Sequence, residues 1–252
     1  MPTDPGGYRS GSRKGLDLTF GTPVTDQPST SAAPAGTRGG ILLRTLRRKS
    51  DRKVISGPSL LADEILRLSG TASIVELVDQ EWCGDISAWP IPSANRRTSL
   101  RIERATDTSS LKPPSVYRSP RIGIDLSHFS TTESLTHPRV VYVSKPYRYF
   151  IHPQLLTANG RVQTFLGVYN ACRASGRNSN NAFGLRRDII RIGGFSDKVA
   201  EKYLADYKDG FKNGSLKAFI GARGKGTSST ASGCLKLFGT LARLQETESD
   251  GQ

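Results

Sequence analysis

A glycine-rich basic segment is the first place where residue types and spacing could bind phosphate. It reads Gly221-Ala222-Arg223-Gly224-Lys225-Gly226-Thr227, and glycines let backbone amides approach an anion. The spacing of a nucleotide-hydrolysing phosphate loop before Gly-Lys-Ser/Thr is missing, and Gly226 stands where a hydroxyl residue should follow Lys225. Two interpretations remain: a flexible solvent loop, or a loop that touches nucleic-acid phosphates through Arg223 and Lys225.

The cysteines and histidines do not follow the spacing of metal ligands. The three cysteines are scattered along the chain: Cys83, Cys172 and Cys234. The three histidines lack the four-residue spacing that places two ligands on one helix face: His128, His137 and His152. We therefore expect no metal, no other cofactor and no disulfide framework, and a reducing intracellular compartment, for example the nucleus.

The chain is strongly basic. Its 252 residues include 36 Lys and Arg against 22 Asp and Glu, a net charge of +14. This charge favours a polyanionic partner through phosphate contacts and counterion release, although a solvated basic surface without a ligand has the same composition. No apolar stretch approaches the roughly 20 residues that span a bilayer, so membrane insertion and secretion are not expected. The sequence leaves protein partners open.

The elements that must position such residues begin with a hairpin. Leu16–Phe20 and Ile41–Leu46 have the pattern of strands, and a loop rich in Pro, Ser and Gly joins them at residues 22–40. A basic run follows at residues 47–53. It could contact phosphates, act as a nuclear address or simply be solvated.

Helix signals and further strand patterns come next. Pro58 stands where an amphipathic helix begins and Gly70 where it ends, and a capping box at Ser73–Glu76 predicts a second helical turn. Three later segments alternate like strands: Leu100–Glu103, Val116–Leu126 and Arg139–Val143.

After Pro153 the apolar period becomes helical. Helices are expected over Val162–Cys172, Arg186–Ile192 and Ser196–Gly210, followed by a Gly- and Ser-rich loop over Gly221–Gly233 and an apolar stretch over Leu235–Leu244. The pattern predicts an α+β fold: a mixed, largely antiparallel sheet with flanking helices, plus a mainly helical C-terminal extension. The expected division is a core at residues 1–152, a helical extension packed on it at 153–245 and a disordered tail at 246–252.

Four segments, in this order, resemble the core of the alkyladenine (3-methyladenine) DNA glycosylases: Gly40–Leu46, Ser56–Leu61, Ser119–Ile124 and Tyr147–Phe150. The resemblance covers roughly residues 8 to 150. It implies a DNA base-excision repair protein that binds duplex DNA, flips a damaged purine out of the stack and hydrolyses its N-glycosidic bond.

The resemblance also implies which residues form the base pocket and the DNA-binding surface. Arg44 matches an arginine that the family holds near the pocket, and the turn Gly57-Pro58-Ser59 matches a helix start that could face phosphate. The remaining matches are Arg121 in the Arg-Ile-Gly strand, Lys145 and Arg148 in an aromatic-basic segment, and Tyr8 and Arg9 at the place of the wedge tyrosine.

The reaction of this family needs a carboxylate that activates water. The family supplies it as a glutamate on a segment before the first resembled strand, whereas this chain has no glutamate before Glu64. Asp17, at the polar position of the pocket strand, is then the candidate base. We expect a diverged or N-terminally truncated relative whose enzyme activity is in question. The alternative is a non-catalytic, basic nucleic-acid-binding protein.

Overall fold

A computed structural model of the chain describes residues 14–20, 39–90, 97–103, 113–176 and 181–250. The chain forms two compact units, residues 1–110 and 111–252. The sequence placed its division at residue 152 instead. The difference arises because the strands around Tyr117 and Phe150 pair with each other and the first of them packs on the helix that begins at Arg161.

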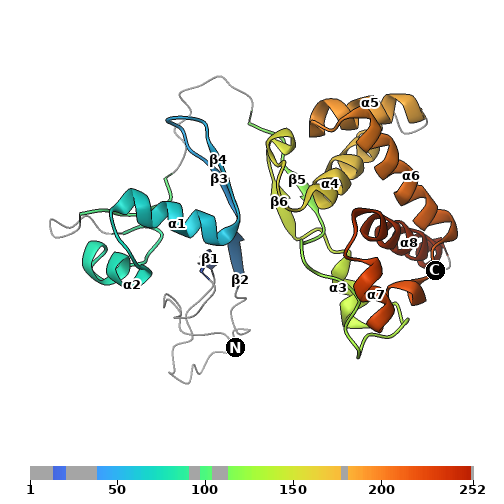
Figure 1. The fold of residues 1–252 in the computed structure, drawn as a ribbon, viewed down its shortest axis with the longest axis horizontal. Coiled ribbons are helices and arrows are strands. Elements are labelled where there is room, and N and C mark those ends of the chain that lie inside the picture. The colour runs from blue at the N-terminus through green and yellow to red at the C-terminus, as the bar shows by residue number, and fades with distance from the viewer. Residues whose placement is uncertain (1–13, 21–38, 91–96, 104–112, 177–180, 251–252) are drawn as a thin grey trace, which may run out of the picture. The chain divides into compact units, whose positions relative to one another are not determined.

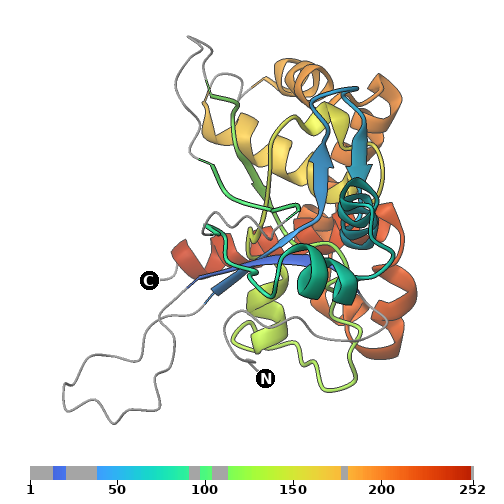
Figure 2. The ribbon, with the colours of Figure 1, turned by 90° about the vertical axis from the view of Figure 1, so that its left-hand side faces the viewer.

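The first unit contains short strands followed by helical turns (Figure 1). In chain order its elements are β1 (Leu16–Phe20), β2 (Gly39–Leu43), β3 (Thr45–Arg47), β4 (Val54–Ser56), α1 (Pro58–Ser69), α2 (Ile74–Glu76) and the π-helical turn η1 (Leu77–Glu81). Two separate antiparallel pairs form, β1 with β2 and β3 with β4. The two strands of each pair run side by side in Figure 2. The hairpin predicted from the sequence is therefore present, but its second strand is divided at Arg44, where the pairing partner changes.

The first helices form where the sequence predicted them. Pro58 lies in the first turn of α1, and Gly70 ends the helix with a left-handed φ of 69° and an N–H that donates to the carbonyls of Leu66 and Arg67. The side chain of Ser73 accepts from the N–H of Glu76 at 3.1 Å. A small core closes this unit; its buried members are Leu66, Leu77, Val78 and Trp82.

The second unit is mainly helical. Its elements are β5 (Tyr117–Ser119), α3 (Pro138–Val143), β6 (Arg148–Phe150), η2 (Pro153–Leu155), α4 (Arg161–Ala174), α5 (Ala182–Gly193), α6 (Asp197–Asn213), η3 (Leu216–Phe219), α7 (Gly221–Thr227) and α8 (Ala231–Asp250). β5 and β6 pair antiparallel. The predicted α+β class and the helical C-terminal region are confirmed. Helix α8 also includes the acidic residues from Glu246, where the sequence predicted a disordered tail.

The predicted strand Arg139–Val143 is wrong, because these residues form α3. Pro138 occupies the first turn, and the ring nitrogen Nδ1 of His137 accepts from the N–H of Arg139 at 3.2 Å. Val140 and Val143, three residues apart, are both buried. The start signals and the helical spacing of two valines outweigh the strand preference of β-branched residues.

Two other predicted strands are shorter or absent. Of Val116–Leu126 only the three residues of β5 are extended, because Pro120 has no N–H to donate and Gly123 turns the chain with a φ of 79°. Leu100–Glu103 has no regular structure. The N–H of Ile102 instead donates to the carbonyl of Ala88 at 2.9 Å.

The predicted loop Gly221–Gly233 is wrong except at residues 228–230, because Gly221–Thr227 form α7 and residues 231–233 begin α8. The hydroxyl of Thr227 donates to the carbonyl of Arg223 at 3.1 Å, and Gly224 is buried. Arg223 and Lys225 are exposed on this short helix. The segment is therefore no glycine-rich phosphate loop.

Helices α6 and α8 approach each other through glycines. A Cβ at Gly239 would lie 2.1 Å from the carbonyl oxygen of Tyr207, and one at Gly210 would lie 2.1 Å from that of Lys236. Both distances are far inside van der Waals contact, so only glycine fits either position. The hydroxyl of Thr240 supports the crossing by donating to the carbonyl of Gly210 at 3.1 Å.

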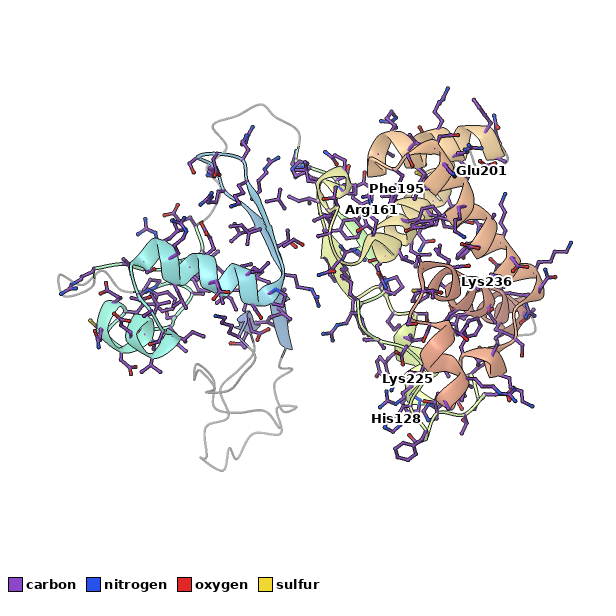
Figure 3. The ribbon with its side chains drawn as sticks, in the orientation of Figure 1. His128, Arg161, Phe195, Glu201, Lys225 and Lys236 are labelled. Carbon is purple, nitrogen blue, oxygen red and sulfur yellow. The ribbon has the colours of Figure 1, made fainter. Side chains whose placement is uncertain are left out.

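A half-buried arginine joins η2, α4 and α5 of this unit. Arg161, at the start of α4, donates to the carbonyls of Gly193 and Gly194 at 3.0 and 2.7 Å, and its guanidinium lies 3.8 Å from the ring centroid of Phe195 (Figure 3). It also donates to the carbonyl of Leu156, after η2, at 3.3 Å. These contacts satisfy the C-terminal carbonyls of α5 and hold it against α4.

We predict that Gly239→Ala lowers the free energy of unfolding of the second unit by about 1–3 kcal/mol, the usual cost of overpacking a core. Gly226→Ala is the control, because nothing lies within 4 Å of a Cβ at that position of α7. It should leave stability unchanged or raise it by about 0.5–1 kcal/mol. Urea denaturation followed by circular dichroism measures both, and equal effects would contradict the close helix contact.

Candidate nucleic-acid interface

The structure brings together the sequence-predicted residues of the first unit. The carbonyl of Arg44, at the junction of β2 and β3, accepts from the N–H of Gly57 at 2.8 Å. The hydroxyl of Ser59 donates to the carbonyl of Lys14 at 3.2 Å, just before β1. Asp17 lies on β1 opposite Leu42 and is exposed. The strand, the arginine and the Gly-Pro-Ser turn therefore adjoin one another. Tyr8 and Arg9 lie outside the described residues.

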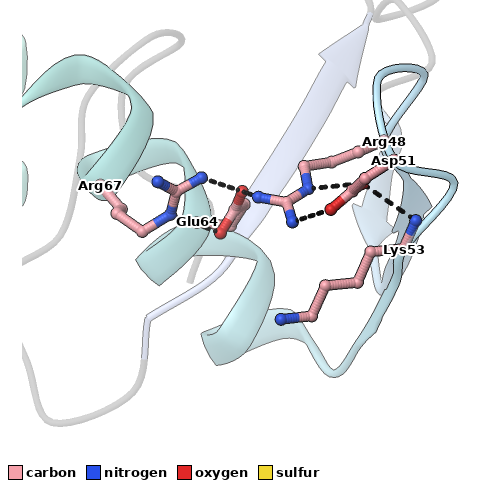
Figure 4. A network of polar contacts seen from close by, with 5 residues as sticks. All are labelled: Arg48, Asp51, Lys53, Glu64 and Arg67. Atoms are coloured by element: carbon pink, nitrogen blue, oxygen red, sulfur yellow. Dashed lines mark hydrogen bonds and ion pairs between the residues drawn. The ribbon is translucent and has the colours of Figure 1, made fainter.

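The basic run at residues 47–53 forms the end of β3 and the turn to β4, and four of its five cations are exposed: Arg47, Lys49, Arg52 and Lys53. Arg48 pairs with Asp51 inside this run and donates to Glu64 of α1 at 2.7 Å (Figure 4). Glu64 also accepts two hydrogen bonds from Arg67, at 2.7 and 3.0 Å. Arg48 is therefore held in an ion-pair network within the first unit.

The network has an electrostatic signature at Glu64. Hydrogen bonds from Arg67 and then from Arg48 favour the charged carboxylate and lower its pKa from 4.5 to about 2. The same bonding to Arg48 lowers the pKa of Asp51. Ionised carboxylates thus hold the turn of β3 and β4 against α1.

We predict that Glu64 makes the stability of the protein depend on pH below its ordinary pKa. Its contribution is fully present above pH 4.5 and is lost as the pH falls toward 2, because the unfolded chain then takes up the proton first. Urea midpoints measured across this window should fall more steeply for the natural protein than for Glu64→Gln. Parallel curves for the two proteins would show that the network does not bind the carboxylate in solution.

In the second unit, the three predicted cations differ in accessibility. Arg148 of β6 is half-buried: it donates to the hydroxyls of Thr164 at 3.1 Å and Ser119 at 3.4 Å. Arg121, after β5, and Lys145, between α3 and β6, are exposed. Arg148 therefore positions the strand pair, while Arg121 and Lys145 are accessible to solvent.

The solvent-facing side of the β5–β6 pair is aromatic. Tyr149 is 60% exposed, and the guanidinium of Arg118 lies 5.3 Å from its ring centroid. Tyr147 is 53% exposed, and its ring centroid lies 6.5 Å from that of Tyr142 in α3. We call these four residues the aromatic face. The pocket prediction named none of them, although Tyr147 and Tyr149 lie in the aromatic-basic segment and alternate along it.

The charge is concentrated in the second unit. Residues 111–252 contain 21 Lys and Arg against 10 Asp and Glu, a net charge of +11, whereas residues 1–110 contain 15 against 12, a net charge of +3. Several acids of the first unit are engaged with cations of the same unit, as in the pair of Lys14 with Asp63. The field that would attract a polyanion therefore originates mainly from the second unit.

Comparison with known proteins gives one viral relative. The chain is 28% identical over 139 residues to the uncharacterized protein L759 of Acanthamoeba polyphaga mimivirus. The aligned part covers 54% of this chain and 58% of the viral protein, so the chain spans less than two thirds of that relative's length. No family model matches the chain, and no solved structure matches it significantly.

The chemistry available to cysteine, histidine and acidic side chains is limited. No group of three of them that could hold a metal ion occurs among the described residues. Burial raises the pKa of the Cys234 thiol to about 12, and burial also raises that of Cys172. The ring of His128 shares a hydrogen bond of 2.7 Å with the hydroxyl of Ser130.

In the same described ranges, no helix is long and apolar enough to cross a membrane.

Proposed function

We propose that this protein binds nucleic acid, with duplex DNA as a partner, through the cations of its second unit. The observation that carries the proposal is the net charge of +11 on residues 111–252. Lysine and arginine side chains that neutralise phosphates release condensed counterions, which supplies most of the free energy of non-specific binding. Contacts to phosphate do not depend on the base sequence, so we expect the protein to bind DNA with weak sequence preference.

The accessible cations near β5 and β6 are the contacts that we assign to phosphate. Three of them are exposed, Arg118, Arg121 and Lys145, and Arg139 at the start of α3 is exposed as well. The residues around them carry no acid, since neither 113–124 nor 138–160 contains Asp or Glu. A phosphate backbone that approaches this region therefore meets cations without local repulsion.

We predict that the purified chain binds labelled duplex DNA at low salt and loses affinity steeply as salt rises. The double variant Arg121→Glu, Lys145→Glu should weaken binding and make the dependence on salt shallower, by about one unit of the log–log slope for each lost phosphate contact. Fluorescence anisotropy titrations at several salt concentrations measure both effects.

The control is the double variant Arg47→Glu, Lys49→Glu, which reverses two exposed charges of the first unit. It changes the net charge by the same amount but should weaken binding less. Equal losses in the two double variants would mean that total charge, rather than the second unit, determines binding. Affinity that is absent at low salt or indifferent to salt would refute the proposal.

A second proposal follows from the resemblance to the alkyladenine DNA glycosylases: descent from a base-excision repair enzyme. It is favoured by the adjacency of the β1 strand, Arg44 and the turn Gly57-Pro58-Ser59 in the first unit. In that case Asp17 would be the base that activates water, and the protein would act on DNA in the nucleus or another compartment that contains DNA.

We predict no release of hypoxanthine or ethenoadenine from duplex DNA above background. Asp17 is exposed on a two-stranded ribbon, and the 10²- to 10⁴-fold help of a general base requires a carboxylate held against its water. Single-turnover excision is the measurement, with Asp17→Asn and, as control, Asp79→Asn at another exposed acid. Excision that disappears only in Asp17→Asn would establish the glycosylase activity and identify its base.

A further inference from the structure

The two sides of the β5–β6 pair have different roles. On the inner side Tyr117 stacks on Phe150 with ring centroids 5.8 Å apart, and Phe150 lies so close to α4 that a Cβ at Gly167 would be 2.7 Å from its ring. Arg148 binds Thr164 of the same helix. The inner side is therefore occupied by the core of the second unit.

The outer side carries aromatic and apolar side chains beside Arg118 although it is exposed. Side chains alternate along a strand, so Tyr149 shares this side with its pairing partner Arg118. The residues that flank the pair, Tyr147, Ile151 and Val116, are also exposed. Tyr149 is 60% exposed, Val116 61% and Ile151 42%. A strand pair with one buried side normally presents polar residues to solvent. Contiguous aromatic and apolar side chains in that position indicate a surface that another molecule covers.

The chemistry of the aromatic face fits one kind of occupant. Exposed tyrosine rings stack on planar groups, and the guanidinium of Arg118 beside Tyr149 adds a second planar, cationic surface. Lys145 and Arg121 supply charge nearby, and the flanking residues 113–124 and 138–160 contain no acid. Planar stacking partners joined by a negative backbone are the bases of a single-stranded nucleic acid.

We propose that the aromatic face, Tyr142, Tyr147, Tyr149 and Arg118, stacks the unpaired bases of single-stranded nucleic acid. The inference rests on the proposed nucleic-acid binding and specifies its ligand. Bases in a duplex present only their edges to a protein, whereas unpaired bases present the faces that a tyrosine ring can cover. The protein should therefore prefer single strands, or unpaired positions in a duplex, over fully paired DNA.

The test compares a fluorescein-labelled oligodeoxythymidylate, longer than the roughly 4 to 16 nucleotides that such surfaces cover, with a duplex of equal length. Tyr149→Ala should weaken binding of the single strand about 5- to 150-fold, the range expected for the loss of one stacked base, and affect the duplex less. Tyr149→Phe keeps the ring and should bind the single strand like the natural protein. Thermal unfolding of both variants shows whether they are folded.

Phe183 provides the matched control, because it is a 74% exposed ring at the start of α5, outside the aromatic face. Phe183→Ala should leave both affinities unchanged. Natural affinity of folded Tyr149→Ala for the single strand would overturn the stacking proposal, while salt-dependent duplex binding would still stand. Absence of all nucleic-acid binding would instead refute the proposed function. Self-association abolished by Tyr149→Ala would assign the face to a second copy of the chain and overturn the proposal.

Discussion

The close contact of α6 with α8 is the constraint on which the second unit depends. With backbone against backbone at Gly210 and Gly239, α8 lies deep enough for Leu235, Leu237 and Leu241 to be almost completely buried. Removal of this apolar surface from water is the main driving force for the fold. Helix α4 then packs near α8, where the amide of Gln163 donates to the sulfur of Cys234 at 3.8 Å.

The contacts of α4 carry this constraint to the candidate interface. At the start of α4, Arg161 donates a hydrogen bond to a carbonyl at the end of α5. One turn later, the hydroxyl of Thr164 accepts a hydrogen bond from the guanidinium of Arg148. Gly167 lets the ring of Phe150 lie directly on the helix. The strand pair is thus anchored along its inner side by a rigid helix, which keeps Tyr149 and Arg118 on the outer side in a defined position. A surface positioned in this way loses little conformational entropy when it binds a ligand.

The parts of the fold that local chemistry determines could be predicted from the sequence. The helix from Pro58 to Gly70, the capping interaction of Ser73 and the helix following Ser196 agree with the structure. The strand predicted at Arg139–Val143 is wrong, because residue preference conflicted there with a Pro and His start signal.

Tertiary contacts account for what the sequence did not show. Arg48 stands in a run of cations, and nothing near it in the sequence indicates that it donates a hydrogen bond to Glu64, sixteen residues later. The division of residues 41–46 at Arg44 likewise depends on which strands become neighbours. The resemblance located Lys145 and Arg148 in one segment, but only the pairing of β5 with β6 shows that Arg148 faces the core while Tyr149 faces solvent.

The unequal environments of the cysteines have a consequence for oxidative chemistry. Oxidants and alkylating reagents attack the thiolate, and a pKa of about 12 keeps Cys234 almost entirely protonated at neutral pH. Cys172 is buried in the same core, whereas Cys83 is exposed in the first unit. Oxidative damage should therefore begin at Cys83 rather than at Cys172 or Cys234.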